Sequence, residues 1–322
     1  MEFLIFIVVF AFIIGSIIGS FLNVVALRGL TGESIVLPPS HCTSCGNKLK
    51  PWHNIPILSY IFLRGRCAFC HEHISIQYPI VELITALTLV GILFKFGPAI
   101  SSIFIFICCC GLIVMTITDL KEMVICVGHV LFLIIAGIFY NIYLSAVQIN
   151  AAAGNFVINF QNIYSLPVTA SLIGILASAL VMEILAGIGK LTVGKRAFGV
   201  GDTFIAAALG AFFGLKAFLV MLIISVAVQV CACIPKYLKK ITAKKDFSLI
   251  IFIASAAGFA YASQAGLLED ILVCLIASAV LLIIGIYACF RVIKGMKEDN
   301  DTTFLPFGPA MAIGAFVWLF CL

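Results

Sequence analysis

The chain has 322 residues, of which 63% are hydrophobic and only 10% are charged. A soluble domain is about half apolar and about a quarter charged, so this composition excludes an ordinary soluble protein and predicts one that crosses the membrane many times. The net charge is +5. Basic clusters beside apolar runs are normal determinants of membrane topology, so we expect the lipid bilayer as a partner and no nucleic acid.

Apolar runs follow one another along the whole chain. A transmembrane helix needs about 20 apolar residues, and suitable runs lie near 3–27, 79–95, 100–118, 124–146, 166–189, 203–215, 217–234, 248–266, 270–290 and 305–322. With the N-terminus outside, every Lys and Arg except Lys95 and Lys216 falls on the cytoplasmic side, as the positive-inside rule expects. The predicted fold class is an all-α polytopic membrane protein, a bundle of about 8–10 transmembrane helices.

One polar loop, residues 29–78, carries two cysteine pairs. Cys42-x-x-Cys45 and Cys67-x-x-Cys70 are separated by 21 residues, and a segment of this size is too small to hold a core unaided. Four thiolates in such pairs can surround Zn²⁺ tetrahedrally, and metal binding then supplies folding energy. The loop is therefore predicted to be a small cytoplasmic domain with a structural zinc. Two disulfides are the alternative, which a reducing cytoplasm disfavours.

The sequence Gly199-Val200-Gly201-Asp202 lies between two apolar runs. An acid entering lipid costs roughly 3 kcal/mol at a helix centre, so it usually has a task. Gly199 and Gly201 lack Cβ atoms, which allows another backbone to come close to the carboxylate. A single acid suggests half of an acid/base pair. Asp119, at the cytoplasmic end of the run 100–118, is the best candidate for the other half.

Other polar or irregular features lie near the same cytoplasmic boundary. Phe307, Gly308 and Pro309 interrupt the backbone as the last run enters lipid, and irregular backbone at that depth lies in protein or lines a water-filled cavity. We therefore expect this element beside the site. Asn23 is interpreted as an interhelical hydrogen-bonding residue, and Glu82 as either a helix-dipole partner or a functional group.

Two carboxylates in a partly dry groove can share a proton, so that one activates a water while the other protonates a carbonyl oxygen. This chemistry predicts peptide hydrolysis without a covalent intermediate. Two other functions stay open: a transporter whose acids form an ion or proton relay, and a presenilin-like protease that cuts within the span of its substrate.

Several motifs together resemble the type IV prepilin peptidases, and the resemblance covers most of the chain. They are, in chain order, Gly19-Ser20-Phe21-Leu22-Asn23 with Arg28, the two cysteine pairs, Asn54-Ile55-Pro56, Leu63-Arg64-Gly65, Tyr78-Pro79-Ile80-Val81-Glu82, Asp119-Leu120, Gly199-Val200-Gly201-Asp202 and Pro306-Phe307-Gly308-Pro309. Two departures stand out. Ile125-Cys126-Val127 replaces the family's Ile-Pro-Asp, and residues 248–300 insert about two further spans.

The resemblance implies a bacterial cytoplasmic (inner) membrane aspartic endopeptidase, with the zinc loop and active site on the cytoplasmic side. Its substrates would be prepilins and pseudopilins, and Asp119 and Asp202 would be catalytic. It also implies N-methylation of the new N-terminus with S-adenosylmethionine by the N-terminal part, where Asn23, Arg28 and Glu82 are candidates for polar support. The implied division is 1–28 first helix, 29–78 zinc-binding domain, 79–247 peptidase core, 248–303 extra pair of spans, and 304–322 last helix.

Overall fold

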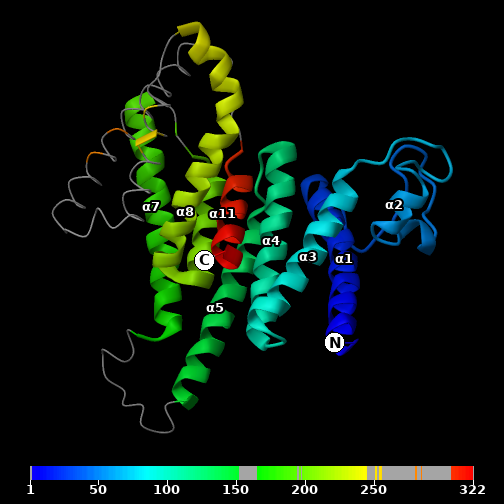
Figure 1. Cartoon of the computed structure of the whole chain (residues 1–322), viewed down its shortest axis with the longest axis horizontal. Coiled ribbons are helices and arrows are strands. Elements are labelled where there is room, and N and C mark those ends of the chain that lie inside the picture. Colours follow the sequence, from blue (N-terminus) through cyan, green and yellow to red (C-terminus); the bar gives the residue numbers. More distant parts are fainter. Residues whose placement is uncertain are drawn as a thin grey trace. The chain divides into compact units, whose positions relative to one another are not determined.

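A computed structural model describes residues 2–151, 165–193, 196, 198–244, 306–321 and a few single positions between 251 and 284. The expected extra pair of spans at 248–303 therefore lies almost wholly outside the described residues. The described part is helical (Figure 1). Its helices are α1 (Glu2–Thr31), the 3₁₀ turn η1 (Pro51–Asn54), α2 (Leu58–Phe62), α3 (Gln77–Phe96), α4 (Ile100–Glu122), α5 (Val127–Ala151), α7 (Pro167–Val193), α8 (Val200–Lys244) and α11 (Gly308–Cys321).

Six of these helices are long and apolar enough to cross a membrane: Ile5–Thr31, Gln77–Phe96, Ile100–Glu122, Val127–Ala151, Pro167–Leu191 and Val200–Gln229. The expected class of polytopic helical membrane protein is therefore confirmed. The chain divides into two compact units, and the first contains Met1–Glu183, Gly199–Val228 and Pro306–Leu322. Asp119, Asp202, Gly308 and the four cysteines of the polar loop all lie in this first unit.

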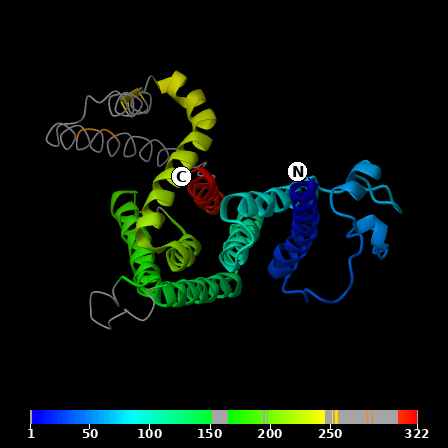
Figure 2. The same cartoon turned by 60° about the horizontal axis from the view of Figure 1, so that its bottom comes forward.

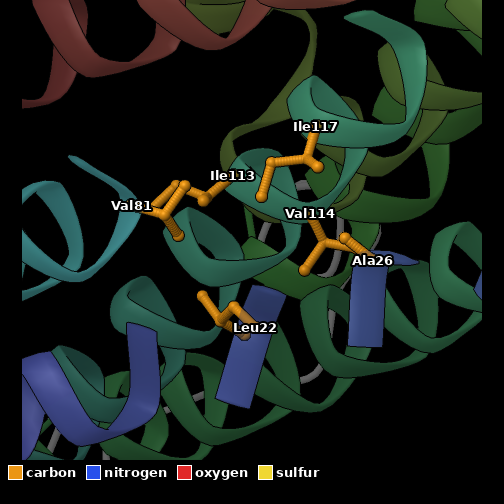
Figure 3. Close-up of a cluster of buried hydrophobic side chains, with 6 residues drawn as sticks. All are labelled: Leu22, Ala26, Val81, Ile113, Val114 and Ile117. Atoms are coloured by element: carbon orange, nitrogen blue, oxygen red, sulfur yellow. The ribbon is translucent and has the colours of Figure 1, made fainter. Parts of the chain in front are cut away.

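Small residues let α1 and α3 pack closely, as the pattern Gly15-Ser16 and Gly19-Ser20 predicts. A Cβ on Gly15 would lie 2.6 Å from the Cα of Ala86, and one on Gly19 would lie 2.7 Å from the Cα of Glu82. The two helices run side by side in both views (Figures 1 and 2). Helix α4 joins them through a cluster of buried apolar side chains: Leu22, Ala26, Val81, Ile113, Val114 and Ile117 (Figure 3).

A leucine at position 19 is expected to destabilise the protein, because its side chain would collide with the backbone of α3 rather than with a movable side chain. Overpacking of this kind costs typically about 1–3 kcal/mol. Thermal unfolding of the detergent-purified protein measures the effect. Gly128→Leu is the matched control, since a Cβ on Gly128 meets nothing within 4 Å. Equal melting temperatures for the two variants would contradict the close α1–α3 contact.

Helix α8 reverses direction at Gly214, where φ is 73° and ψ is 174°. Before the break, Phe213 lies against Trp318 of α11. After the break, Met221 and Ser225 of α8 lie against Gly314, which is one helical turn nearer the start of α11 than Trp318. The chain therefore returns along α11, and the hairpin expected between runs 203–215 and 217–234 is present.

The break in α8 exposes backbone carbonyls that the helix can no longer satisfy. Asn141 Nδ2 donates to the carbonyl oxygens of Ala211 and Phe212, at 2.8 and 3.1 Å, and Ser171 Oγ donates to Ala211 O at 2.6 Å. Both donors, Asn141 on α5 and Ser171 on α7, are buried. Because lipid offers no hydrogen bonds, such internal partners make an interrupted helix tolerable at membrane depth.

Candidate active site

Asp202 lies in the first turn of α8, three residues after its N-cap Gly199. Its Oδ2 accepts a 2.9 Å hydrogen bond from the backbone N–H of Gly199. An acid at the third position of a helix stabilises many helix starts by accepting such a bond from the N-cap residue. The positive end of the α8 dipole also favours a carboxylate here. The G-x-G-D sequence therefore forms a helix N-terminus that fixes one carboxylate oxygen.

Asp119 lies in the last turn of α4, and the residue after the helix, Met123, caps it with a positive φ of 53°. The negative end of its own helix dipole opposes a carboxylate at this position. The compensation comes from α11, whose first residue, Gly308, donates its backbone N–H to Asp119 Oδ2 at 2.9 Å. The Phe307-Gly308-Pro309 element therefore lies against Asp119, because its glycine supplies this donor.

Gly308 has no side chain for a specific reason. A Cβ at that position would lie 2.5 Å from Asp119 Oδ2, too close for either atom to stay in place. Phe307, one residue earlier, is buried and keeps the start of α11 within the protein. The approach of this helix end to Asp119 therefore depends on glycine.

The two aspartates lie at helix ends that adjoin each other. Both side chains are buried, with exposed fractions of 6% for Asp119 and 8% for Asp202. Gly201 brings their elements together, because a Cβ there would lie 2.7 Å from the Cδ1 of Ile125, in the turn that follows α4. Ile125 belongs to the segment that departs from the family pattern, and here it is the contact between the two halves of the site.

A polar pair beside Asp202 was not predicted as part of the site. Thr203, the next residue, donates its hydroxyl to Glu183 Oε1 of α7 at 2.9 Å. Glu183 is an acid inside the candidate span Pro167–Leu191, and the Thr203 hydroxyl gives its Oε1 a polar partner there. Its partner could not be identified, because Thr203 carries no pattern that distinguishes it from other residues of α8.

The four cysteines of the polar loop meet as predicted. Their sulfur atoms all lie within 4.8 Å of one another, and Cys42 Sγ lies 3.8 Å from Cys70 Sγ. A tetrahedral Zn²⁺ with Zn–S bonds of about 2.3 Å places its sulfurs about 3.8 Å apart. All four are free thiols rather than disulfides. This donor set fits a closed structural zinc site.

The two cysteine pairs form matching knuckles. Isolated bridges pair His41 with Lys48 around the first and Arg66 with His73 around the second. The residue after each second cysteine has a positive φ: 69° at Gly46 and 59° at His71. In each knuckle its N–H bonds back to the carbonyl of the first cysteine. The flanking histidines therefore shape the knuckles in this structure, while the cysteines form the donor set.

Backbone groups prepare one thiol to bind a metal. Hydrogen bonds from the N–H groups of Cys45 and Ser44 lower the pKa of Cys42 to about 6. The N–H of Glu72 acts in the same direction on Cys70, but desolvation and the other three sulfurs raise the pKa of Cys70 to about 12. Four adjacent thiols therefore cannot all ionise without a cation among them, and a metal would displace their protons.

The three residues named as polar support tie the loop to the membrane helices. Asn23 is fully buried; its Nδ2 donates to Tyr78 O at 3.4 Å and its Oδ1 accepts from Gln77 Nε2 at 3.3 Å. Arg28 donates to the carbonyl oxygens of Ser34, Ile35 and Pro38, at 2.8, 3.3 and 2.6 Å. Glu82 Oε2 accepts from the backbone N–H of Ile57 at 2.7 Å. The expected interhelical role of Asn23 is confirmed.

These features define a class: a multi-pass helical membrane protein with a buried aspartate pair at helix ends and a separate four-cysteine module. Comparison with known families gives two matches in chain order. Residues 13–96 match the bacterial peptidase A24 N-terminal domain, and residues 105–234 match the type IV leader peptidase family. The chain belongs to the type IV leader peptidase family.

Named relatives agree with this assignment. A prepilin leader peptidase/N-methyltransferase of Burkholderia pseudomallei (strain 1026b) is 31% identical over 233 residues, covering 65% of this chain and 69% of the relative. One of Neisseria gonorrhoeae is 30% identical over 253 residues, covering 71% and 82%. One of Pseudomonas putida is 27% identical over 237 residues, covering 67% and 76%. No solved structure matches the chain.

Proposed function

We propose that the protein is a membrane aspartic endopeptidase that removes the leader of type IV prepilins or pseudopilins at the cytoplasmic face of the bacterial inner membrane, and that it N-methylates the new N-terminus. The observation that carries the proposal is the pair of backbone hydrogen bonds that hold Asp119 and Asp202, from Gly308 and Gly199, within one buried site. Relatives named for this activity support it. Family membership favours neither the transporter nor the presenilin-like alternative.

The geometry supports a division of labour within each carboxyl group. Oδ2 of each aspartate accepts a backbone N–H, which fixes the side chain. The other oxygen, Oδ1, is the one we assign to the reaction with water and substrate. One carboxylate removes a proton from a water molecule, the hydroxide attacks the scissile carbonyl carbon, and the protonated partner donates to the carbonyl oxygen. Collapse of the tetrahedral intermediate releases the amine of the mature pilin, which takes a proton from the pair.

The position of the site suits a substrate with one hydrophobic end. Asp119 lies at the end of the span Ile100–Glu122, and Asp202 lies at the beginning of the span Val200–Gln229. A pilin whose hydrophobic helix lies in the bilayer and whose basic leader lies in the cytoplasm would present its cleavage junction at this depth. The positive-inside pattern of the chain supports a cytoplasmic location for these helix ends.

We assign methyl transfer to the N-terminal part, because the A24 N-terminal domain match, residues 13–96, contains the whole cysteine module. S-adenosylmethionine would supply the methyl group, which passes from its sulfonium sulfur to the uncharged amine nitrogen of the cleaved pilin. Asn23, Arg28 and Glu82 act here as positioning residues: their hydrogen bonds fix the loop against α1 and α3. The zinc proposed for Cys42, Cys45, Cys67 and Cys70 keeps the loop folded.

Replacing Cys67 by serine is expected to remove the zinc and unfold the loop, because Cys67 is the buried member of the cluster and a small module of this kind folds on its metal. Metal analysis of the protein purified in reducing buffer should find one zinc per chain, and none in Cys67→Ser. Cys231→Ser is the control, since Cys231 is an exposed free thiol of α8. Equal zinc contents in the two variants would contradict the assignment.

The function as a whole is tested by intact-mass analysis of a purified prepilin after incubation with the protein in lipid vesicles. We expect loss of the leader in one cut before the hydrophobic helix. In the presence of S-adenosylmethionine we also expect the added mass of one methylene. Cleavage inside the helix would support the presenilin-like alternative instead, and an unchanged prepilin would contradict the proposal.

A further inference from the structure

A group of large apolar side chains is exposed on the cysteine module, outside every candidate span. It is formed by η1, α2 and the turn between them, and its members are Trp52, Ile55, Leu58, Ile61 and Phe62, which we call the 52–62 patch. Phe62 is 80% exposed, Ile61 62% and Trp52 60%. Soluble surfaces rarely gather such residues within one short segment unless another phase or partner covers them.

The start of α2 is fixed to a membrane helix. Ile57, the residue before α2, donates its backbone N–H to Glu82 Oε2 at 2.7 Å, and it adopts a positive φ of 63° that is unfavourable for a β-branched residue. Glu82 is the sixth residue of the candidate span Gln77–Phe96. At 1.5 Å per residue it lies about 7–8 Å along the helix from its first residue.

This depth corresponds to the boundary of the bilayer. The polar headgroup region on each side of the hydrocarbon core is about 5–8 Å thick. A strained turn held at that level by a buried carboxylate places α2 beside the lipid headgroups rather than out in solvent. The Ile57–Glu82 hydrogen bond therefore fixes the segment that carries the 52–62 patch near the level at which α3 enters the membrane.

The charged side chains within the segment that carries the patch are all basic. From Ser34 to His71 the sequence contains four basic residues, Lys48, Lys50, Arg64 and Arg66, and no acidic one. All four are exposed, and the Lys50 Nζ lies 5.3 Å from the centre of the Trp52 ring. Cations beside exposed aromatic and aliphatic side chains suit the surface of a membrane that contains anionic lipid.

We propose that the 52–62 patch is an interfacial anchor that rests on an anionic phospholipid surface next to α3. Trp52 and Phe62 enter the headgroup boundary, and Lys50, Arg64 and Arg66 contact lipid phosphates. The anchor holds the cysteine module flat against the membrane on which the N-terminus of a processed pilin would emerge. Glu82 positions it through Ile57.

The chain offers its own probe, because Trp52 and Trp318 are its only two tryptophans. Trp318→Phe leaves Trp52 as the single emitter in the full-length protein, which is reconstituted in vesicles of phosphatidylcholine with or without phosphatidylglycerol. Bromine on the upper acyl chain reports lipid contact and aqueous iodide reports solvent. At a burial depth of about 5–10 Å, we expect brominated lipid to remove about half of the Trp52 emission, more strongly with phosphatidylglycerol, and iodide to have little effect.

A pair of variants in the same background separates anchoring from folding. Ile61→Ser with Phe62→Ser should expose Trp52 to iodide and reduce quenching by brominated lipid, whereas Ile61→Leu with Phe62→Leu should preserve both signals. Zinc content should be unchanged in each. Strong iodide quenching of Trp52 in the starting protein would overturn the proposal. Protection of Trp52 from iodide that appears only when a prepilin is added would assign the patch to the substrate instead. Protection that increases with the number of protein molecules per vesicle would assign it to a second copy of the chain.

Discussion

Replacing Asp202 by asparagine is expected to reduce prepilin cleavage by about 10³-fold or more, within the range for loss of a general acid or base. The asparagine oxygen can still accept the N–H of Gly199 that now bonds to Oδ2, so the start of α8 is preserved while the exchangeable proton is lost. Asp119→Asn is expected to have an equal effect for the same reason, with Gly308 as donor.

The measurement is the initial rate of leader removal with purified protein and prepilin. Glu122→Gln is the matched control, because it makes the same chemical change at the exposed end of α4, three residues beyond Asp119. The control should cleave at the normal rate. Full activity in either asparagine variant would remove that aspartate from the reaction, even if the other variant were inactive.

Adding a single methyl group at Gly308 is the second change with a large expected effect. In Gly308→Ala the new Cβ would stand 2.5 Å from Asp119 Oδ2, so the start of α11 must move and its hydrogen bond to the carboxylate is lost. Hydrogen bonds to charged groups contribute about 1.5–3 kcal/mol, which corresponds to a fall in kcat of about 10- to 150-fold. We expect KM to change little, because the group lost acts on Asp119 rather than on the pilin.

Gly128→Ala makes the same change at a position with free space around it, and it should leave kcat unaltered. Thermal unfolding of both variants separates lost positioning from lost stability. A normal kcat in Gly308→Ala would show that the contact between α11 and Asp119 has no role in the reaction.

The sequence was informative where a pattern is local. The two cysteine pairs and the small residues of α1 each lie within a few positions, and each makes the contacts predicted for it. The glycines of the G-x-G-D element were expected to admit another backbone beside Asp202. Instead, Gly199 donates its own N–H to that carboxylate, and Gly201 lies against the side chain of Ile125. The helix reversal near Gly214 was also predictable, because glycine and Lys216 interrupt an apolar run. Local chemistry sufficed in these cases.

Contacts over long distances in the chain could be predicted only in outline. Gly308 and Asp119 are 189 positions apart, and nothing in either segment states that an amide of one bonds to the carboxylate of the other. The contact of Gly201 with Ile125 and the bond from Ile57 to Glu82 likewise depend on how helices pack. A pattern can show that an acid needs a partner in lipid, but packing decides which group it is.

The central claim is that Asp119 and Asp202 act on the same carbonyl group. Its most direct test is the affinity of the protein for a prepilin leader peptide whose scissile amide is replaced by a hydroxyethylene group, which places a hydroxyl where the reacting oxygens would lie. Transition-state analogues bind at least about 10²-fold more tightly than substrates. We predict that Asp119→Asn and Asp202→Asn each lose that tight binding to a similar extent, while Glu122→Gln retains it. Unchanged affinity in either aspartate variant would contradict the claim.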